Sequence, residues 1–179
     1  MNPDAPDIAN TRVKLGTDHY QELDADQIPT GKIIAHPSVP NPDTEFTLTS
    51  TVPSFDDCFV LPSRTDPSEY SSIASSTPLD TRPLPLRKLC SLSHPETRLN
   101  LEIESTEPAF QFYTGEGIDV EELEKADGTK QQAMGARKGI AIEPSRFVDC
   151  AGRQEWRNMC TLKRGETWGA RSVYRAWKE

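Results

Sequence analysis

The amino-acid sequence predicts an all-β fold, an antiparallel β-sandwich, and three observations support this prediction. Apolar and polar residues alternate in several short segments, which is typical of strands with one buried face. The 179 residues include 15 prolines and 10 glycines, which favour turns and short strands over long helices. Strand patterns do not alternate with helical patterns, so the parallel sheet of an α/β protein is not expected.

The first half of the chain contains four predicted strands. One is expected in "TRVKLG", residues 11–16, because its apolar residues alternate. Residues 18–34 are expected to form two strands with a turn at residues 29–31, where the sequence reads Pro-Thr-Gly. "DDCFVLP", residues 56–62, is the fourth. Residues 63–85 are dense in Ser, Pro and Thr, which predicts a long surface loop rather than a packed element.

The second half continues the pattern. "TRLNLEIEST", residues 97–106, is the clearest strand, and "FQFYTG", residues 110–115, is an aromatic strand that ends in a glycine turn. "VEELEKADG", residues 120–128, is expected to form one or two helical turns. The closing residues 159–177 are expected to form a hairpin with "KRGE" at its turn. We expect eight or nine short strands in a single domain over residues 1–179.

Composition restricts the classes of partner and compartment. The net charge is −8 and no basic stripe occurs, so neither nucleic acid nor a membrane surface is an expected partner. No apolar run has membrane-spanning length, and the N-terminus is polar and acidic, which predicts a cytoplasmic protein. The four cysteines form no C-x-x-C pattern, so we expect free thiols and no metal site.

One stretch carries a candidate catalytic group. In "GIAIEPSRF", residues 139–147, Ile140 and Ile142 alternate as in a half-buried strand and lead directly into Glu143 and Pro144. A carboxylate that a stiff backbone holds at a strand end suits general-base chemistry. An ordinary exposed strand end has the same pattern, so this stretch alone leaves both interpretations open.

Five stretches, taken in order, resemble the aldose 1-epimerases (galactose mutarotases), particularly those of fungi. They are "ELDADQIPTGKI", "SFDDCFVL", "EPAFQFYTGEGI", "GIAIEPSRFVDC" and "LKRGETWGARSVYRAW". The resemblance extends from about Val13 to Trp177 and covers roughly the C-terminal half of such a protein. It implies an antiparallel β-sandwich of the galactose mutarotase type, truncated on its N-terminal side.

The resemblance also implies an activity and a ligand. The family interconverts the α and β anomers of free hexoses such as galactose and glucose, without a metal or an organic cofactor. A carboxylate removes the proton of the C1 hydroxyl while a histidine protonates the ring oxygen. The resemblance therefore implies a small-molecule aldose sugar as the partner of this chain, and no cofactor.

The resemblance assigns roles to three residues of this chain. Glu143 falls where the family carries its general base, and Pro144 would stiffen the turn that aims it. Asp56 corresponds to a sugar-binding aspartate, since charge-assisted hydrogen bonds to hydroxyls are strong. Asp57 would point the other way if both lie on a strand. Gln111 corresponds to a glutamine of the sugar pocket, whose amide can both donate and accept.

The family's acid, a histidine in an H-x-Y-x-N type of motif, has no counterpart in residues 1–179. His19, His36 and His94 match no family motif and are expected to be surface residues. Arg146 and Trp156 are expected to support the fold. The chain is then either part of an ordinary mutarotase or a short paralogue without catalysis. A non-catalytic carbohydrate-binding or interaction module on the same fold is the alternative function, and an unrelated β-sandwich adhesion domain is a third possibility.

Overall fold

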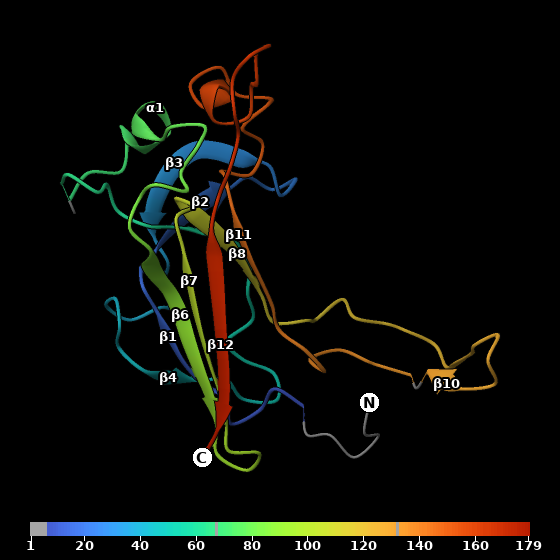
Figure 1. Ribbon diagram of the computed structural model, residues 1–179. Helices are drawn as coiled ribbons and strands as arrows, with labels where there is room; N and C mark the ends of the chain where they lie inside the picture. The colour runs from blue at the N-terminus through green and yellow to red at the C-terminus, as the bar shows by residue number, and fades with distance from the viewer. Residues whose placement is uncertain (1–6, 67, 132) are drawn as a thin grey trace.

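Two five-stranded antiparallel sheets pack face to face in the computed structural model, which describes residues 7–66, 68–131 and 133–179 (Figure 1). Sheet A has the strand order β12-β7-β6-β1-β4, and sheet B has the order β11-β8-β5-β2-β3. The elements are β1 (Arg12–Leu15), β2 (His19–Leu23), β3 (Pro29–Ala35), β4 (Phe46–Thr47), β5 (Asp56–Val60), α1 (Ile73–Ser76), β6 (Arg87–His94), β7 (Leu99–Ser105), β8 (Ala109–Tyr113), β9 (Leu123–Glu124), β10 (Lys130–Gln131), β11 (Ala141–Ser145), the 3-10 helix η1 (Arg157–Met159) and β12 (Ser172–Lys178). The predicted antiparallel sandwich is confirmed, whereas the single domain over residues 1–179 stays a prediction.

The main core lies between the two sheets. Sheet A contributes Val13, Leu89 and Ile103, and sheet B contributes Phe59 and Phe110, all fully buried. The rings of Phe59 and Phe110, on neighbouring strands, stack with their centroids 5.7 Å apart. Burial of each such side chain contributes roughly 1.5–3 kcal/mol, so this layer holds the two sheets together.

A second cluster covers one end of the outer face of sheet B. Cys58 and Val60 point to this face because side chains alternate along β5, and Ile73 and Ala74 of α1 and the nearby Trp156 pack in the same cluster. The expectation that residues 63–85 form an unpacked loop is therefore wrong for the segment around α1. Residue 67 lies outside the described residues. Trp156 packs in a core, as a supporting residue should.

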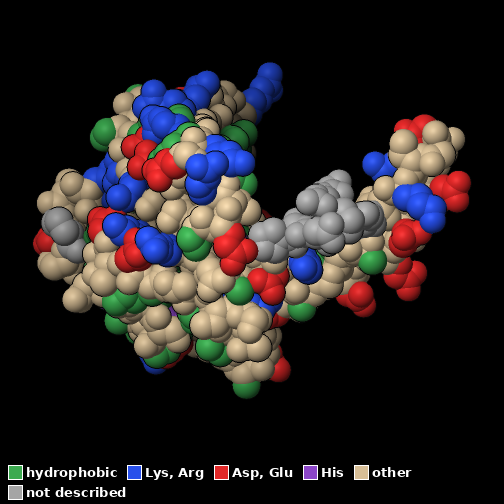
Figure 2. Space-filling view, turned by 90° about the horizontal axis from the view of Figure 1, so that it is seen from below, with side chains coloured by type: hydrophobic (Ala, Val, Ile, Leu, Met, Phe, Trp, Pro, Cys, Tyr) green, Lys and Arg blue, Asp and Glu red, His purple; other side chains and the backbone are tan. Residues whose placement is uncertain are grey.

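An arm that carries β9 and β10 projects from the body of the sandwich (Figures 1 and 2). The helical turns expected at residues 120–128 are wrong, because this segment forms one side of a two-stranded hairpin. The amide of Lys125 donates to the carbonyl oxygen of Thr129 over 2.8 Å, and Gly128 has a φ of +78°. An Asp-Gly pair is a strong hairpin signal because such a turn needs positive φ angles, and here it outweighs the helix-forming residues before it.

Two further predictions are wrong in detail. The turn between β2 and β3 precedes Pro29 and is closed by the Asp24 amide, which donates to the Ile28 carbonyl over 2.9 Å. The closing residues do not form a hairpin, because β12 pairs along its whole length with β7. Strand β6, residues 87–94, was not predicted, although it pairs with both β7 and β1.

Strands β11 and β12 form the two sheet edges on the same side of the sandwich. The hydroxyl of Tyr174 in β12 donates to the carbonyl of Ile142 in β11 over 3.2 Å and so joins the two edges. Among the described residues each of these strands has a pairing partner on one side only. Tyr174 and Trp177 of β12 are about half exposed. This side therefore presents unpaired backbone groups together with apolar surface.

Candidate functional site

Three adjacent strands of sheet B carry the residues for which the sequence suggests a role. In the ladder, Glu143 of β11 lies opposite Gln111 of β8, and Gln111 lies opposite Cys58 of β5. Asp56 is two residues before Cys58 and therefore points to the same face. The alternation of side chains along three strands in register thus brings Glu143, Gln111 and Asp56 together on the outer face of sheet B.

These three side chains line one open cavity of about 540 Å³. Its lining residues come from β2 and the turn after it, from β5, β8 and β11, and from the segment after β11: Gln21, Leu23, Gln27, Asp56, Cys58, Gln111, Glu143, Ser145, Arg146 and Val148. A hexose is smaller than this volume, so the cavity has room for one together with water. The structure brings together all three predicted site residues, while their roles stay predictions.

The polar floor of the cavity is already ordered. The Nε2 atom of Gln111 donates to Oδ1 of Asp56 over 2.8 Å. This bond directs the Gln111 amide oxygen away from Asp56, and that buried oxygen has no hydrogen-bond partner among the described residues. A buried acceptor without a partner costs about 1–3 kcal/mol, and a ligand hydroxyl that donates to it would remove this cost. Asp56 keeps its other carboxylate oxygen for further hydroxyl groups.

Glu143 is an exposed side chain in the middle of β11, which corrects the expectation that it stands at a strand end. Pro144 does not form a turn either, because it continues the strand opposite Phe110. A proline is tolerated at this position because β11 is an edge strand, where an amide hydrogen can be missing without breaking a ladder on both sides. The proline therefore stiffens the strand that carries the carboxylate.

Asp57 points to the opposite face, as the alternation predicts, so only Asp56 of the pair faces the cavity. Asp57 lies 3.4 Å from Nε2 of His36, whose side chain is only 8% exposed. The rings of Tyr20 and Phe55 pack around His36. The expectation that His36 is a surface residue is wrong, because an aromatic pocket inside the sandwich and a carboxylate hold it.

The other two histidines also make their contacts away from the cavity. The ring of His19 stacks on Tyr70 with centroids 4.2 Å apart, and its Nδ1 lies 2.7 Å from the carboxylate of Asp18. The Nε2 atom of His94 lies 3.0 Å from the carbonyl oxygen of Ala9. None of the three histidines lines the cavity. Its described lining residues supply carboxylates, amides, one hydroxyl, one thiol and the guanidinium of Arg146.

Gln21 is a site residue that sequence reasoning missed. It is completely buried, and its amide binds both backbone groups of Val148, accepting from the amide nitrogen over 2.8 Å and donating to the carbonyl oxygen over 3.3 Å. These two bonds tie the segment after β11 to β2 and close one wall of the cavity. The available signal was a polar residue at the central position of a short strand, which is common on solvated faces and therefore not distinctive.

Arg146 supports the wall next to Glu143. Its guanidinium donates to the carbonyl oxygens of Pro78 and Leu79, each over 3.0 Å, and its Nε lies 2.8 Å from the buried carboxylate of Glu107. Burial raises the pKa of Glu107, and the charge of Arg146 opposes that shift. The support role expected for Arg146 agrees with these contacts, which link the cavity wall to residues of two distant segments.

The thiol in the floor of the cavity is not poised for nucleophilic chemistry. Burial raises the pKa of Cys58 to about 12, so the thiol stays protonated near neutral pH. Among the described residues no group of three or more histidine, cysteine, aspartate or glutamate side chains is arranged to hold a metal ion. In the same part of the chain, no helix is long and apolar enough to cross a membrane.

Comparison with known proteins agrees with the resemblance seen in the motifs. The sequence profile of the family described as aldose 1-epimerase matches residues 1–175. The chain belongs to the aldose 1-epimerase family. It is 31% identical over 168 residues to the bifunctional protein gal10 of Schizosaccharomyces pombe and 31% identical over 170 residues to GAL10 of Kluyveromyces lactis. Each match covers 93% of this chain but only 20% and 21% of the two relatives, so the chain spans about a fifth of their length.

A solved structure with the same fold is that of the GalM/aldose epimerase homologue from C. elegans. It superposes with a TM-score of 0.67 at 17% sequence identity and covers 99% of this chain and 49% of that one. This likeness supports the galactose mutarotase type of sandwich for the aldose 1-epimerase chain described here.

Proposed function

We propose that this chain binds a free hexose such as galactose or glucose on the outer face of sheet B and supplies the base side of anomer interconversion. The observation that supports this most is the convergence of Glu143, Asp56 and Gln111 on one open cavity. Asp56 and the free amide oxygen of Gln111 would hold sugar hydroxyls. The exposed carboxylate of Glu143, on the neighbouring strand, would face the C1 hydroxyl.

The reaction begins when Glu143 takes the proton of the C1 hydroxyl. The electron pair of that O–H bond forms the C1 carbonyl, the bond between C1 and the ring oxygen breaks, and the ring oxygen takes a proton from a general acid. Rotation about C1–C2 and the reverse steps give the other anomer, with Glu143 returning the proton. Residues 1–179 contain no H-x-Y-x-N motif, so the base side is the part of the reaction that this chain's own residues would perform.

The second candidate is a carbohydrate-binding module without catalysis. The observation that favours it is that none of the three histidines lines the cavity. Binding requires Asp56 and Gln111 but gives no reason for a base beside them. The two functions therefore differ in the consequence of replacing Glu143. If the chain is a catalyst, the rate of anomerisation falls; if it is a binding module, only local contacts change.

The deciding experiment measures binding and rate separately. Binding of galactose and glucose is followed by saturation-transfer NMR, and anomerisation of freshly dissolved α-galactose is followed by polarimetry. Glu143→Gln keeps the shape and removes the basicity, so the catalysed rate should fall about 10²- to 10⁴-fold with little change in binding. Glu124→Gln, on the exposed strand β9, is the matched control and should behave as the unmodified protein.

Each result selects one function. A Glu143→Gln variant that anomerises as fast as the unmodified protein would show that Glu143 is not the base. An unmodified protein that binds hexose but leaves the rate of anomerisation at its buffer value would establish the binding module. If neither hexose binds, both candidate functions are wrong.

A further inference from the structure

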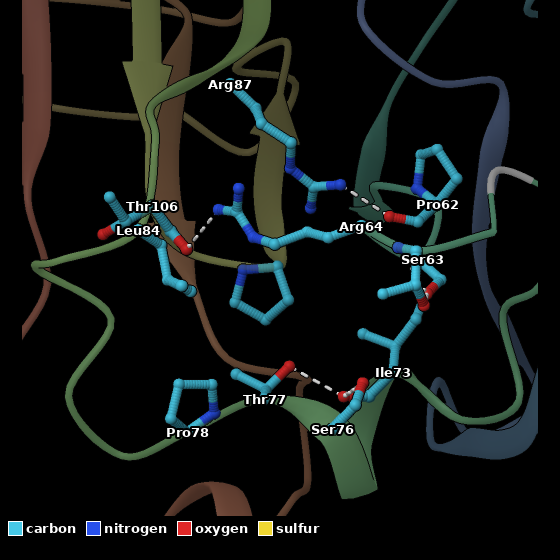
Figure 3. Close-up of a pocket in the computed structure, with 12 residues that line it drawn as sticks. Pro62, Ser63, Arg64, Ile73, Ser76, Thr77, Pro78, Leu84, Arg87 and Thr106 are labelled. Atoms are coloured by element: carbon cyan, nitrogen blue, oxygen red, sulfur yellow. Dashed lines mark hydrogen bonds between the residues drawn. The ribbon is translucent and has the colours of Figure 1, made fainter.

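A second cavity, of about 280 Å³, lies outside the site described above and shares none of its lining residues (Figure 3). It is enclosed by the segment after β5, by α1 and the two residues that follow it, and by the segments that flank β6 and β7. The lining residues are Pro62, Ser63, Arg64, Thr65, Ile73, Ser76, Thr77, Pro78, Leu84, Arg87, Thr106 and Pro108. None of them is acidic, whereas two are arginines and five carry hydroxyl groups.

The two guanidinium groups lie next to one another in this cavity (Figure 3). Arg64 donates to the carbonyl oxygens of Pro85 over 3.0 Å and Thr106 over 3.2 Å, and Arg87 donates to that of Pro62 over 2.5 Å. These bonds hold both side chains by backbone groups, which carry no countercharge. Among the described residues no carboxylate forms an ion pair with either arginine.

The protein therefore holds two positive charges together without neutralising them. Burial lowers the pKa of Arg64, and burial together with the charge of Arg64 lowers the pKa of Arg87 to about 10. Partly buried charges are normally paired, because an uncompensated charge loses its hydration. An anion between the two groups would supply the missing countercharge.

Both arginines also keep N–H groups that these bonds do not use. The Nε atom of Arg87 is buried and has no hydrogen-bond partner among the described residues. Arg64 uses only two of the five N–H groups that a guanidinium offers. Planar guanidinium groups match the oxygen geometry of phosphate through paired hydrogen bonds. A doubly charged oxyanion fits two adjacent arginines better than a single carboxylate does, because it balances both charges.

We propose that this cavity is a phosphate-binding site, formed by Arg64 at its mouth and Arg87 inside it, that takes inorganic phosphate or the phosphate group of a sugar monoester. The hydroxyl groups of Ser63 and Thr65 also line the cavity and lie 3.1 Å apart, so one donates to the other and the remaining hydroxyl hydrogen can serve a phosphate oxygen. The site is independent of the hexose site, so a failure of the proposed anomerisation would leave it untouched.

The test titrates the full chain with inorganic phosphate by isothermal calorimetry at pH 7.5, with ionic strength kept constant by chloride. Loss of one charged hydrogen-bonding partner costs about 1.5–3 kcal/mol, which is about a 10- to 100-fold loss of affinity. The Arg64→Gln/Arg87→Gln double variant should therefore bind phosphate at least tenfold more weakly. Arg164→Gln removes the same charge from an exposed turn and should leave phosphate binding unchanged.

If the double variant does not fold, the single variant Arg64→Gln decides the test. Arg64 is exposed at the mouth of the cavity, so its replacement should not prevent folding, and it should still weaken phosphate binding severalfold. Hexose 6-phosphate, titrated in parallel, separates the two sources: tighter binding than that of inorganic phosphate assigns a sugar monoester, and equal binding assigns the free ion. The proposal is overturned if millimolar phosphate does not bind, or if the arginine variants bind it as tightly as Arg164→Gln does.

Discussion

At the scale of single residues, the ion pair between Arg146 and Glu107 shows how the cavity wall is held. Both side chains are buried, and Arg146 also binds two carbonyl groups of the segment before β6. A buried charge without its partner is strongly destabilising, by about 3–5 kcal/mol, whereas removal of both charges is often close to neutral. The pair therefore acts as a unit, and its two members should not be independent in their effect on stability.

We expect Glu107→Leu and Arg146→Met each to lower the free energy of unfolding by about 3–5 kcal/mol, and the double variant to lose less than the sum. Urea unfolding of the four proteins measures this coupling. Glu102→Leu with Arg175→Met, a solvent-accessible pair on sheet A whose arginine also contacts Glu104, is the matched control and should show a coupling of at most about 1 kcal/mol. Strict additivity at Glu107 and Arg146 would contradict the interpretation.

The site residues differ in how far the sequence alone could predict them. Asp56, Gln111 and Glu143 lie in stretches that carry the family resemblance, and period-two alternation places Asp56 and Asp57 on opposite faces. Gln21 could not be predicted, because its function depends on Val148, which is 127 positions away in the chain. The burial of His36 depends in the same way on rings contributed by other segments.

At the scale of elements, local patterns predicted strands best where the ladder is regular. Strand β6 was missed because its register shifts between Lys88 and Cys90, so that Leu89 and Cys90 are both buried and the alternation is interrupted. The partner of β12 could not be predicted, because β7 lies about seventy residues earlier and nothing local specifies that pairing. In the arm, the acidic and basic residues before the turn favour a helix, whereas the Asp-Gly turn that follows them favours the hairpin that forms.

The arm is expected to be dispensable for folding. Val120 and Met134 exchange two backbone hydrogen bonds of 2.8 Å at its base, and the side chains of β9 beyond them are exposed. Replacement of residues 121–133 by Asn-Gly would close the same pair with a two-residue turn. The free energy of unfolding should then change by no more than about 0.5 kcal/mol, as expected for changes at exposed positions.

The control for the arm lies at its root, where the buried Arg137 donates to the carbonyl oxygens of Pro53 and Thr49. Arg137→Met leaves those carbonyls without their donor and should destabilise the protein by several kcal/mol. Thermal unfolding of both variants compares them directly. A large loss of stability on removing the arm would mean that the arm contributes to the fold and not only to the surface.

At the scale of the whole molecule, one side of the sandwich carries two strand edges, β11 and β12, that have no further pairing partner within residues 7–66, 68–131 and 133–179, and exposed aromatic residues lie beside them. Long exposed edges with apolar side chains are templates for pairing with another chain. Trp177 of β12 is 46% exposed and lies on such an edge. The partial resemblance predicted a truncated sandwich, but the position of these edges on β11 and β12 follows only from the strand order.

We therefore expect the isolated chain to self-associate as its concentration rises, and Trp177→Lys to suppress this. Sedimentation velocity over a range of concentrations measures the effect. Trp168→Lys adds the same charge at a tryptophan that is 53% exposed but lies outside β12, and it should associate as the unmodified protein does. Equal suppression by both variants would point to net charge rather than to the edge strand.

The register of β11, β8 and β5 has a consequence for changes in chain length. A single residue inserted or deleted within β11 would bring Ile142 or Pro144 opposite Gln111 and turn the carboxylate of Glu143 to the other face of the sheet. The connection from Gly115 to Gly139 can lengthen or shorten without moving that row, because its ends are joined by backbone hydrogen bonds at the root of the arm. Insertions and deletions should therefore accumulate in the arm of related chains, while the three strands keep their length.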